Sequence, residues 1–128
     1  ELGRELDRRA RSVSKVSDAL VQVNLAGEVT KGGFPPDDLK NALEALAPLT
    51  GIRVRGLMTI PPFAEDPEAS RPWFRQLREL ATLVNGWGLD RVEMTHLSMG
   101  MSGDFEVAVE EGATMVRIGT AIFGPRAK

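Results

Sequence analysis

Apolar and polar positions repeat with two different periods along this chain, and the two periods predict strands that are separated by helices. Short apolar segments, some with alternating polar residues, predict strands over residues 18–26, 52–60, 91–98 and 114–118. Apolar residues that recur every three or four positions predict amphipathic helices. These helices are expected over residues 2–11, from residue 35 to a stop at Pro48, over 67–85 and over 103–111.

The order of these elements indicates an α/β fold with parallel strands. Strands that are separated by amphipathic helices form right-handed βαβ units, whose strands lie parallel in one sheet. Four such strands with their helices make half of a (β/α)8 barrel, and we expect residues 1–128 to form one partial domain of this kind. A small doubly wound sheet is the alternative arrangement.

The last predicted strand and the residues after it contain the most informative polar group. Residues 114–118 are β-branched or apolar apart from Arg117, which predicts a strand that is buried on both faces. A guanidinium in such a strand needs an anion or several acceptors. Gly119 and Thr120 follow directly and offer backbone N–H groups and a hydroxyl, as phosphate sites do. The alternative is that Arg117 forms a structural ion pair at a sheet edge.

Ligands of parallel α/β proteins bind at the carboxyl ends of the strands. The segment from Ser98 to Ser102 is expected there as a loop, with Ser102 capping the helix over residues 103–111. Its glycine and serine residues, like Gly119 and Thr120, suit a phosphate group. His96 is the only histidine and lies inside a predicted strand, so we interpret it as a core or supporting residue and not as a catalytic one.

Composition excludes several classes of function. The chain has 128 residues and no cysteine, which excludes disulfides, thiol catalysis and cysteine-ligated metals and is consistent with a cytoplasmic protein. With a single histidine, we expect no metal site. A net charge of −2 argues against non-specific binding of nucleic acid. Apolar segments all fall short of the roughly 18 residues that cross a membrane, and no signal peptide is visible.

Three segments resemble one known family. They are HLSMGMSGDFEVAVEEGATMVRIGTAIFG at 96–124, VRGLMTIPP at 54–62 and VQVNLAGEVTKGG at 21–33. They closely resemble the YggS-type pyridoxal phosphate homeostasis proteins, in the same order and with consistent spacing. The resemblance implies a (β/α)8 barrel similar to the amino-terminal domain of alanine racemase. It also implies a protein that binds pyridoxal 5′-phosphate and buffers or delivers it, without an assigned catalytic residue.

The resemblance suggests roles for individual residues at the cofactor. Ser98, Gly119 and Thr120 would hold the cofactor phosphate, with help from Ser102, and Arg117 would lie near the phosphate or the pyridine ring. The two remaining candidates are Met58 at the pocket wall and Asn24 at the pocket edge.

One feature of the family has no counterpart in this chain. The family's Schiff-base lysine lies on the first barrel strand, whereas the segments matched here belong to the carboxyl-terminal half. Lys15, Lys31, Lys40 and Lys128 all fall outside that position. We therefore expect non-covalent cofactor binding through the phosphate. An open half barrel also exposes two sheet edges, so we expect it to associate with a second copy or with the missing amino-terminal half.

Two other functions remain open from the residues alone. The first is a fragment of an amino-acid racemase-like enzyme, although the chain has no tyrosine to share proton transfer with a lysine. The second is a self-associating structural half barrel with an empty phosphate site. A shift in visible absorbance on addition of the cofactor would indicate covalent attachment to a lysine, and loss of phosphate binding with preserved folding would favour the structural role.

Overall fold

The computed structural model describes residues 2–29 and 32–119, which form four strands that alternate with helices. Three connections between the strands carry helices, in agreement with the periodicity of the sequence. Two of these helices are preceded by a short 3-10 helix that starts at a proline, a residue whose fixed backbone angle suits a first helical turn. In chain order the elements are α1 (Leu2–Ser12), β1 (Ser17–Gln22), η1 (Pro36–Asp38), α2 (Leu39–Leu46), β2 (Ile52–Met58), η2 (Pro67–Ser70), α3 (Arg71–Asn85), β3 (Val92–Met101), α4 (Phe105–Glu110) and β4 (Met115–Arg117).

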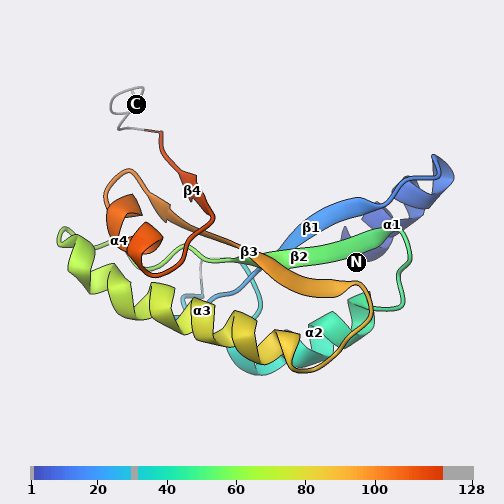
Figure 1. The fold of residues 1–128 in the computed structure, drawn as a ribbon, viewed down its shortest axis with the longest axis horizontal. Coiled ribbons are helices and arrows are strands. Elements are labelled where there is room, and N and C mark those ends of the chain that lie inside the picture. Colours follow the sequence, from blue (N-terminus) through green and yellow to red (C-terminus); the bar gives the residue numbers. More distant parts are fainter. Residues whose placement is uncertain (1, 30–31, 120–128) are drawn as a thin grey trace.

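All four strands are parallel, and their order across the sheet, β1-β2-β3-β4, is their order along the chain (Figure 1). A doubly wound sheet would reverse its strand order at a switch point, which this sheet does not do. The described residues therefore form a curled half of a (β/α)8 barrel, as the sequence predicts.

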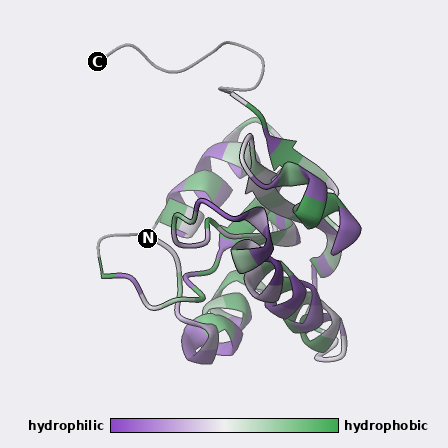
Figure 2. Ribbon diagram, turned by 90° about the vertical axis from the view of Figure 1, so that its left-hand side faces the viewer, coloured by the Kyte–Doolittle hydropathy of each residue, from purple (hydrophilic) through white to green (hydrophobic). Residues whose placement is uncertain are grey.

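The hydrophobic core lies between the sheet and its helices. In Figure 1, α2 and α3 lie along one side of the sheet, and Figure 2 shows hydrophobic and hydrophilic stretches alternating along the helices. Phe74 and Leu77 of α3 are fully buried, as are Leu39 and Leu43 of α2, and they pack with Leu57 of β2 in one cluster. This burial of one helical stripe explains the apolar period of these segments.

The opposite face of the sheet is polar and exposed. Asp18, Arg53 and Thr95 lie on it, and each is solvent-exposed. The Nε of Arg53 donates to Asp18 at 2.8 Å, and the Nε of Arg55 donates to Thr95 at 3.2 Å. These contacts join β1, β2 and β3 at the amino ends of the strands.

Two strands differ from the sequence-based prediction. β3 continues to Met101, so the segment from Ser98 to Met101 is strand and the predicted loop is wrong there. β4 is short, and its residues Met115 and Arg117 are exposed, so the prediction of a strand buried on both faces is also wrong. The reason is its position: β4 pairs with β3 only and forms an edge of the sheet in the described part of the chain.

Candidate functional site

One row of residues crosses the sheet near the carboxyl ends of the strands. Gln22 pairs with Met58, Met58 pairs with Ser98, and Ser98 pairs with Met115. Paired residues of neighbouring strands point to the same face, so this row lies on the face opposite the core. Arg117 is two residues beyond Met115 and shares that face. The sheet thus brings together three of the predicted site residues, Met58, Ser98 and Arg117.

Ser98 is the central member of this row. It is only 7% exposed, and its carbonyl oxygen accepts the N–H of Thr59 at 3.1 Å. In contrast, its hydroxyl has no hydrogen-bond partner among residues 2–29 and 32–119. The residue is mostly buried, but its hydroxyl oxygen is not fully enclosed, so water or a ligand can reach it. The Ser98 hydroxyl is therefore available to a ligand that approaches this face.

Arg117 provides the positive charge of the site. Its side chain is exposed, and it forms no ion pair with the other described residues. The interpretation as a buried arginine is wrong because β4 is an edge strand, and the alternative of a structural ion pair finds no partner in the described region. Gly119 is exposed, with no atom within 4 Å of the place where a Cβ would lie. Thr120 lies outside the described residues, so its predicted role stays a prediction.

The arginines at the other end of the same face are already paired. Arg53 donates to Asp18 at 2.8 Å, and Nη1 of Arg55 lies 3.8 Å from the same carboxylate. The Arg53 guanidinium lowers the pKa of the Asp18 carboxyl below its usual value. Both arginines already contact this carboxylate, whereas Arg117 has no ion-pair partner among the described residues and is therefore the more favourable place for an anion.

The turn after β3 corrects the prediction for Ser102. α4 begins at Phe105 with Asp104 before it, and no side chain caps its first turn. Asp104 instead binds back to the strand, where its Oδ1 accepts the N–H of Met101 at 2.7 Å and its own N–H donates to the Met101 carbonyl at 3.1 Å. This closed turn ends β3, and Ser102 lies inside it and not at the helix start.

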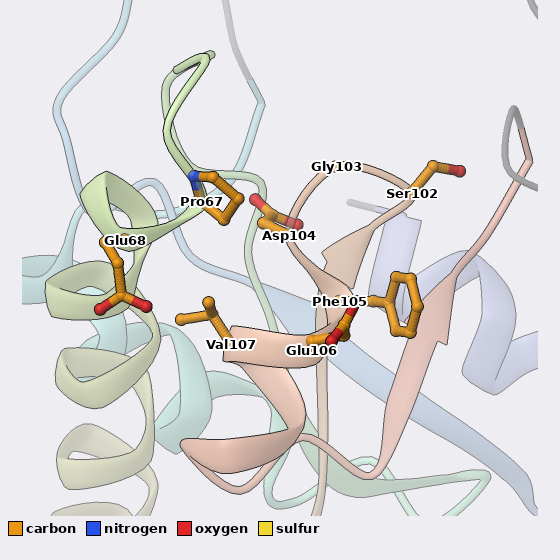
Figure 3. A pocket seen from close by; sticks show the side chains of 8 residues that line it. All are labelled: Pro67, Glu68, Ser102, Gly103, Asp104, Phe105, Glu106 and Val107. Atoms are coloured by element: carbon orange, nitrogen blue, oxygen red, sulfur yellow. The ribbon is translucent and has the colours of Figure 1, made fainter.

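A cavity of about 230 Å³ lies between this turn and η2 (Figure 3). Glu68, Asp104 and Glu106 line it, and carboxylates repel a phosphate group. In Figure 3 the side chain of Ser102 points away from Glu68. The cavity is therefore unsuitable for phosphate. It is a different site from the row that contains Ser98.

Asn24 organises the loop that follows β1. Its Nδ2 donates to the carbonyl of Glu28 at 2.7 Å, and its Oδ1 accepts the N–H of Glu28 at 3.1 Å. The buried Thr59 hydroxyl donates to the carbonyl of Val23 at 2.8 Å and joins this loop to β2. Asn24 thus lies beside the row as a loop residue.

His96 lies outside the core, on β3, where it is half-buried. Its Nδ1 is 3.3 Å from the hydroxyl oxygen of Thr114, which accepts the N–H of Leu97 at 2.9 Å. His96 is therefore a supporting residue between β3 and the start of β4. Sequence reasoning missed the role of Thr114, because a threonine in a strand segment carries no sign of the backbone groups it will meet.

The described residues contain no cluster of His, Asp or Glu that could hold a metal ion. A helix long and apolar enough to cross a membrane is likewise not found among them.

Comparison with known proteins identifies the family. Residues 1–127 match the model of the alanine racemase N-terminal domain family. The chain belongs to this family.

Members of the alanine racemase N-terminal domain family that resemble the chain confirm the relationship inferred from its sequence signature. The pyridoxal phosphate homeostasis protein of Aquifex aeolicus is 52% identical over 125 residues, which cover 98% of this chain and 54% of that protein. The pyridoxal phosphate homeostasis protein of Pseudomonas aeruginosa is 49% identical over 106 residues, or 83% of this chain and 44% of that protein. The chain therefore spans about half the length of these relatives.

Solved structures agree with the assignment to the alanine racemase N-terminal domain family. PipY of Synechococcus elongatus PCC7942 with PLP bound matches with a TM-score of 0.84 and 36% identity, over 96% of this chain and 56% of that chain. Alanine racemase of Corynebacterium glutamicum matches with a TM-score of 0.69 and 21% identity, over 91% of this chain and 34% of that chain, and at this identity it shows the fold alone.

Proposed function

We propose that this chain supplies the phosphate-binding half of a site for pyridoxal 5′-phosphate in a cofactor homeostasis protein, without a lysine for covalent attachment. The observation that carries the proposal is the Ser98 hydroxyl, which has no hydrogen-bond partner among the described residues and lies on the same face as the exposed Arg117. The names of the curated relatives and the PLP-bound PipY structure support pyridoxal 5′-phosphate as the anion.

Each group has a distinct task in this proposal. The Ser98 hydroxyl and the Gly119 backbone N–H donate to phosphate oxygens, and Arg117 supplies a positive charge that offsets the phosphate dianion. Met58 provides apolar contact for the pyridine ring at the wall of the site, while Asn24 holds the adjoining loop. Ser102 and Thr120 complete the set of proposed ligands.

The donor set suits a phosphoryl group and provides little for proton transfer. When bound, pyridoxal phosphate supplies an electron sink for amino-acid chemistry, but that chemistry needs a lysine at the cofactor. Among the described lysines, Lys15 lies in the turn before β1, and Lys40 lies on α2 with its Nζ 5.4 Å from the centre of the Trp87 ring. These positions support binding without catalysis. We also propose that the protein is located in the cytoplasm.

The partner proposed for this chain is the other half of a family barrel. An apolar groove of about 780 Å³ lies between α1 and α2 against β1, with Leu6, Leu20 and Leu46 in its lining. β1 pairs with β2 only, so its other edge has no strand partner in the described part of the chain. A half barrel of the same family offers the strand and the apolar helix that such an edge and groove need, and the curated relatives are about twice this length.

The proposed cofactor site is tested by titrating the chain with pyridoxal 5′-phosphate, inorganic phosphate and pyridoxal while monitoring binding by calorimetry. We expect the two phosphate-bearing ligands to bind and pyridoxal to bind poorly. Ser98→Ala and Arg117→Ala should each weaken binding about tenfold, the effect of losing one hydrogen bond to a charged group. Arg9→Ala, which removes an exposed arginine of α1, is the control. Equal binding by all four proteins would contradict the proposal.

The proposed partner is tested by sedimentation of the chain alone and of the chain mixed with the amino-terminal half of a curated relative. A one-to-one complex between the two halves is the expected result. A homodimer that excludes the other half would show a second copy to be the occupant. A stable monomer at tens of micromolar that binds neither would overturn the proposal.

A further inference from the structure

Glu111, the residue that follows α4, is a buried carboxylate surrounded by arginines of α3. It is 7% exposed. Its Oε2 accepts from Nη1 of Arg71 at 2.8 Å, and its Oε1 accepts from Nη1 of Arg78 at 3.0 Å. The Nε of Arg75 lies 3.5 Å from the same Oε1. Residues 71, 75 and 78 share one side of α3, because positions four and seven apart in a helix lie on one face.

The same arginines bind further groups of α4 and η2. Arg78 also donates to the backbone carbonyl of Glu111 at 3.1 Å, where the helix leaves carbonyls without partners. Arg71 donates to Glu110 at 2.6 Å and to Glu68 of η2 at 2.8 Å. The hydrogen bond from Arg71 is the main cause of a lowered pKa of the Glu111 carboxyl, so the group is charged at neutral pH. Glu111 and the arginines thus form one ionic clamp between α3 and the end of α4.

α4 in turn rests directly on the end of β3 that carries Ser98. Gly100 has a φ of +103°, and a Cβ at this position would lie 2.6 Å from the Cβ of Ala108 and 3.2 Å from the Cα of Phe105. The helix also connects to the start of β4, since the N–H of Ala113 donates to the Ala108 carbonyl at 2.9 Å. A rotation of α4 would therefore displace both the end of β3 and the start of β4.

We propose that Glu111 is a positioning residue for the phosphate site: through Arg71 and Arg78 it fixes α4 on α3 and thereby sets the strand ends that carry Ser98 and Arg117. This inference rests on the proposed function. The apolar residues Val107 and Ala108 already bury one side of α4 against the sheet. Apolar packing is non-directional, whereas a carboxylate that must meet two guanidinium groups at hydrogen-bond distance permits one orientation of the helix.

The test compares Glu111→Gln with Glu79→Gln, which removes a charge from an exposed position of α3. The first readout is amide hydrogen exchange without ligand. At Met101, whose N–H binds Asp104, we expect exchange to be about tenfold faster in Glu111→Gln, while exchange at Val54 in β2 changes little. The second readout is the affinity for inorganic phosphate and for pyridoxal 5′-phosphate, which should fall about fivefold or more, as for a displaced binding group.

A variant that is destabilised elsewhere in the core separates positioning from general stability. Leu43→Ala opens a cavity under α2, away from the clamp, and lowers the stability of the whole domain. We expect it to leave phosphate affinity unchanged in the folded protein, and we expect Arg71→Lys, which keeps the charge but not the fork of donors, to give an intermediate loss. If Glu111→Gln matches Glu79→Gln in both readouts, or if Leu43→Ala weakens phosphate binding as strongly, the positioning role is wrong. If the unmodified chain binds neither ligand, the proposed function fails, while the exchange rates still decide whether Glu111 sets the end of β3.

Discussion

The Asp7 carboxylate of α1 accepts the backbone N–H of Gly51 at 2.5 Å, across 44 positions of the sequence. The side chain is almost completely buried, and its other oxygen accepts from Nε of Arg11 at 3.0 Å. Gly51 immediately precedes β2, so α1 is fastened to the second strand of the sheet and not only to β1, which follows it in the chain. This contact places α1 at one side of the apolar groove.

Removal of the Asp7 carboxylate should destabilise the fold. Asp7→Ala leaves the buried N–H of Gly51 without an acceptor, and we expect a loss of about 1–3 kcal/mol in the free energy of unfolding. Urea denaturation monitored by circular dichroism measures it. Glu5→Ala is the control, because Glu5 forms only exposed ion pairs with Arg8 and Arg9 and should change stability little. Equal effects of the two substitutions would show that the Asp7 contact contributes nothing specific.

A side chain at position 56 should separate β2 from β3. Gly56 pairs with His96, and a Cβ at this position would overlap the His96 carbonyl group. Because this obstacle is backbone, we expect Gly56→Ala to cost about 1–3 kcal/mol or more, the range of overpacked cores. Gly103→Ala is the matched control, since a Cβ there meets nothing within 4 Å. Thermal denaturation of the two variants tests this, and equal midpoints would contradict it.

The hydroxyl of Thr114 should contribute more to the stability of the fold than its methyl group does. Thr114→Val keeps the shape of the side chain but removes the acceptor of the Leu97 N–H, which we expect to cost about 1 kcal/mol or more. Thr114→Ser keeps the oxygen and should cost less. Urea denaturation of the two variants measures the difference. Equal losses of stability in Thr114→Val and Thr114→Ser would contradict this prediction.

Stability should depend on pH in the acidic range. Arginine hydrogen bonds lower the pKa values of Asp18, Glu68 and Glu111 below their ordinary values of 3.8 to 4.5. A carboxyl whose pKa is lower in the folded state stabilises that state above its unfolded pKa, and this stabilisation is lost as the pH falls through the folded pKa. We therefore expect a constant unfolding free energy from about pH 8 to about pH 5 and a decline below that range.

Arg71→Ala provides the comparison for this pH dependence, because it removes the main cause of the shifts at Glu68 and Glu111. Its unfolding free energy should fall less steeply below pH 5 than that of the unmodified chain, as measured by urea denaturation at a series of pH values. An identical slope in both proteins would show that these carboxyls are not coupled to folding.

The site could be predicted from the sequence only in part. Ser98 and Met58 lie in one row on the face opposite the core, since strand alternation and parallel pairing are enough to bring them together. Ser102 was predicted to cap α4, but the turn after β3 places Asp104 there, because the strand continues to Met101 before the chain turns. Where a strand ends depends on its pairing with neighbours, which local residues do not specify.

By itself, the sequence determined the α/β class of the fold and the family. The local periods of apolar residues and the length of the helical connections leave parallel βαβ units as the physically consistent arrangement. Only the tertiary structure decided the exposure of Arg117 and the clamp around Glu111. The first depends on whether another strand lies beside β4, and the second joins Arg71 to a carboxylate 40 positions away. Burial and long-range ion pairing are properties of the assembled sheet and helices, so no local pattern encodes them.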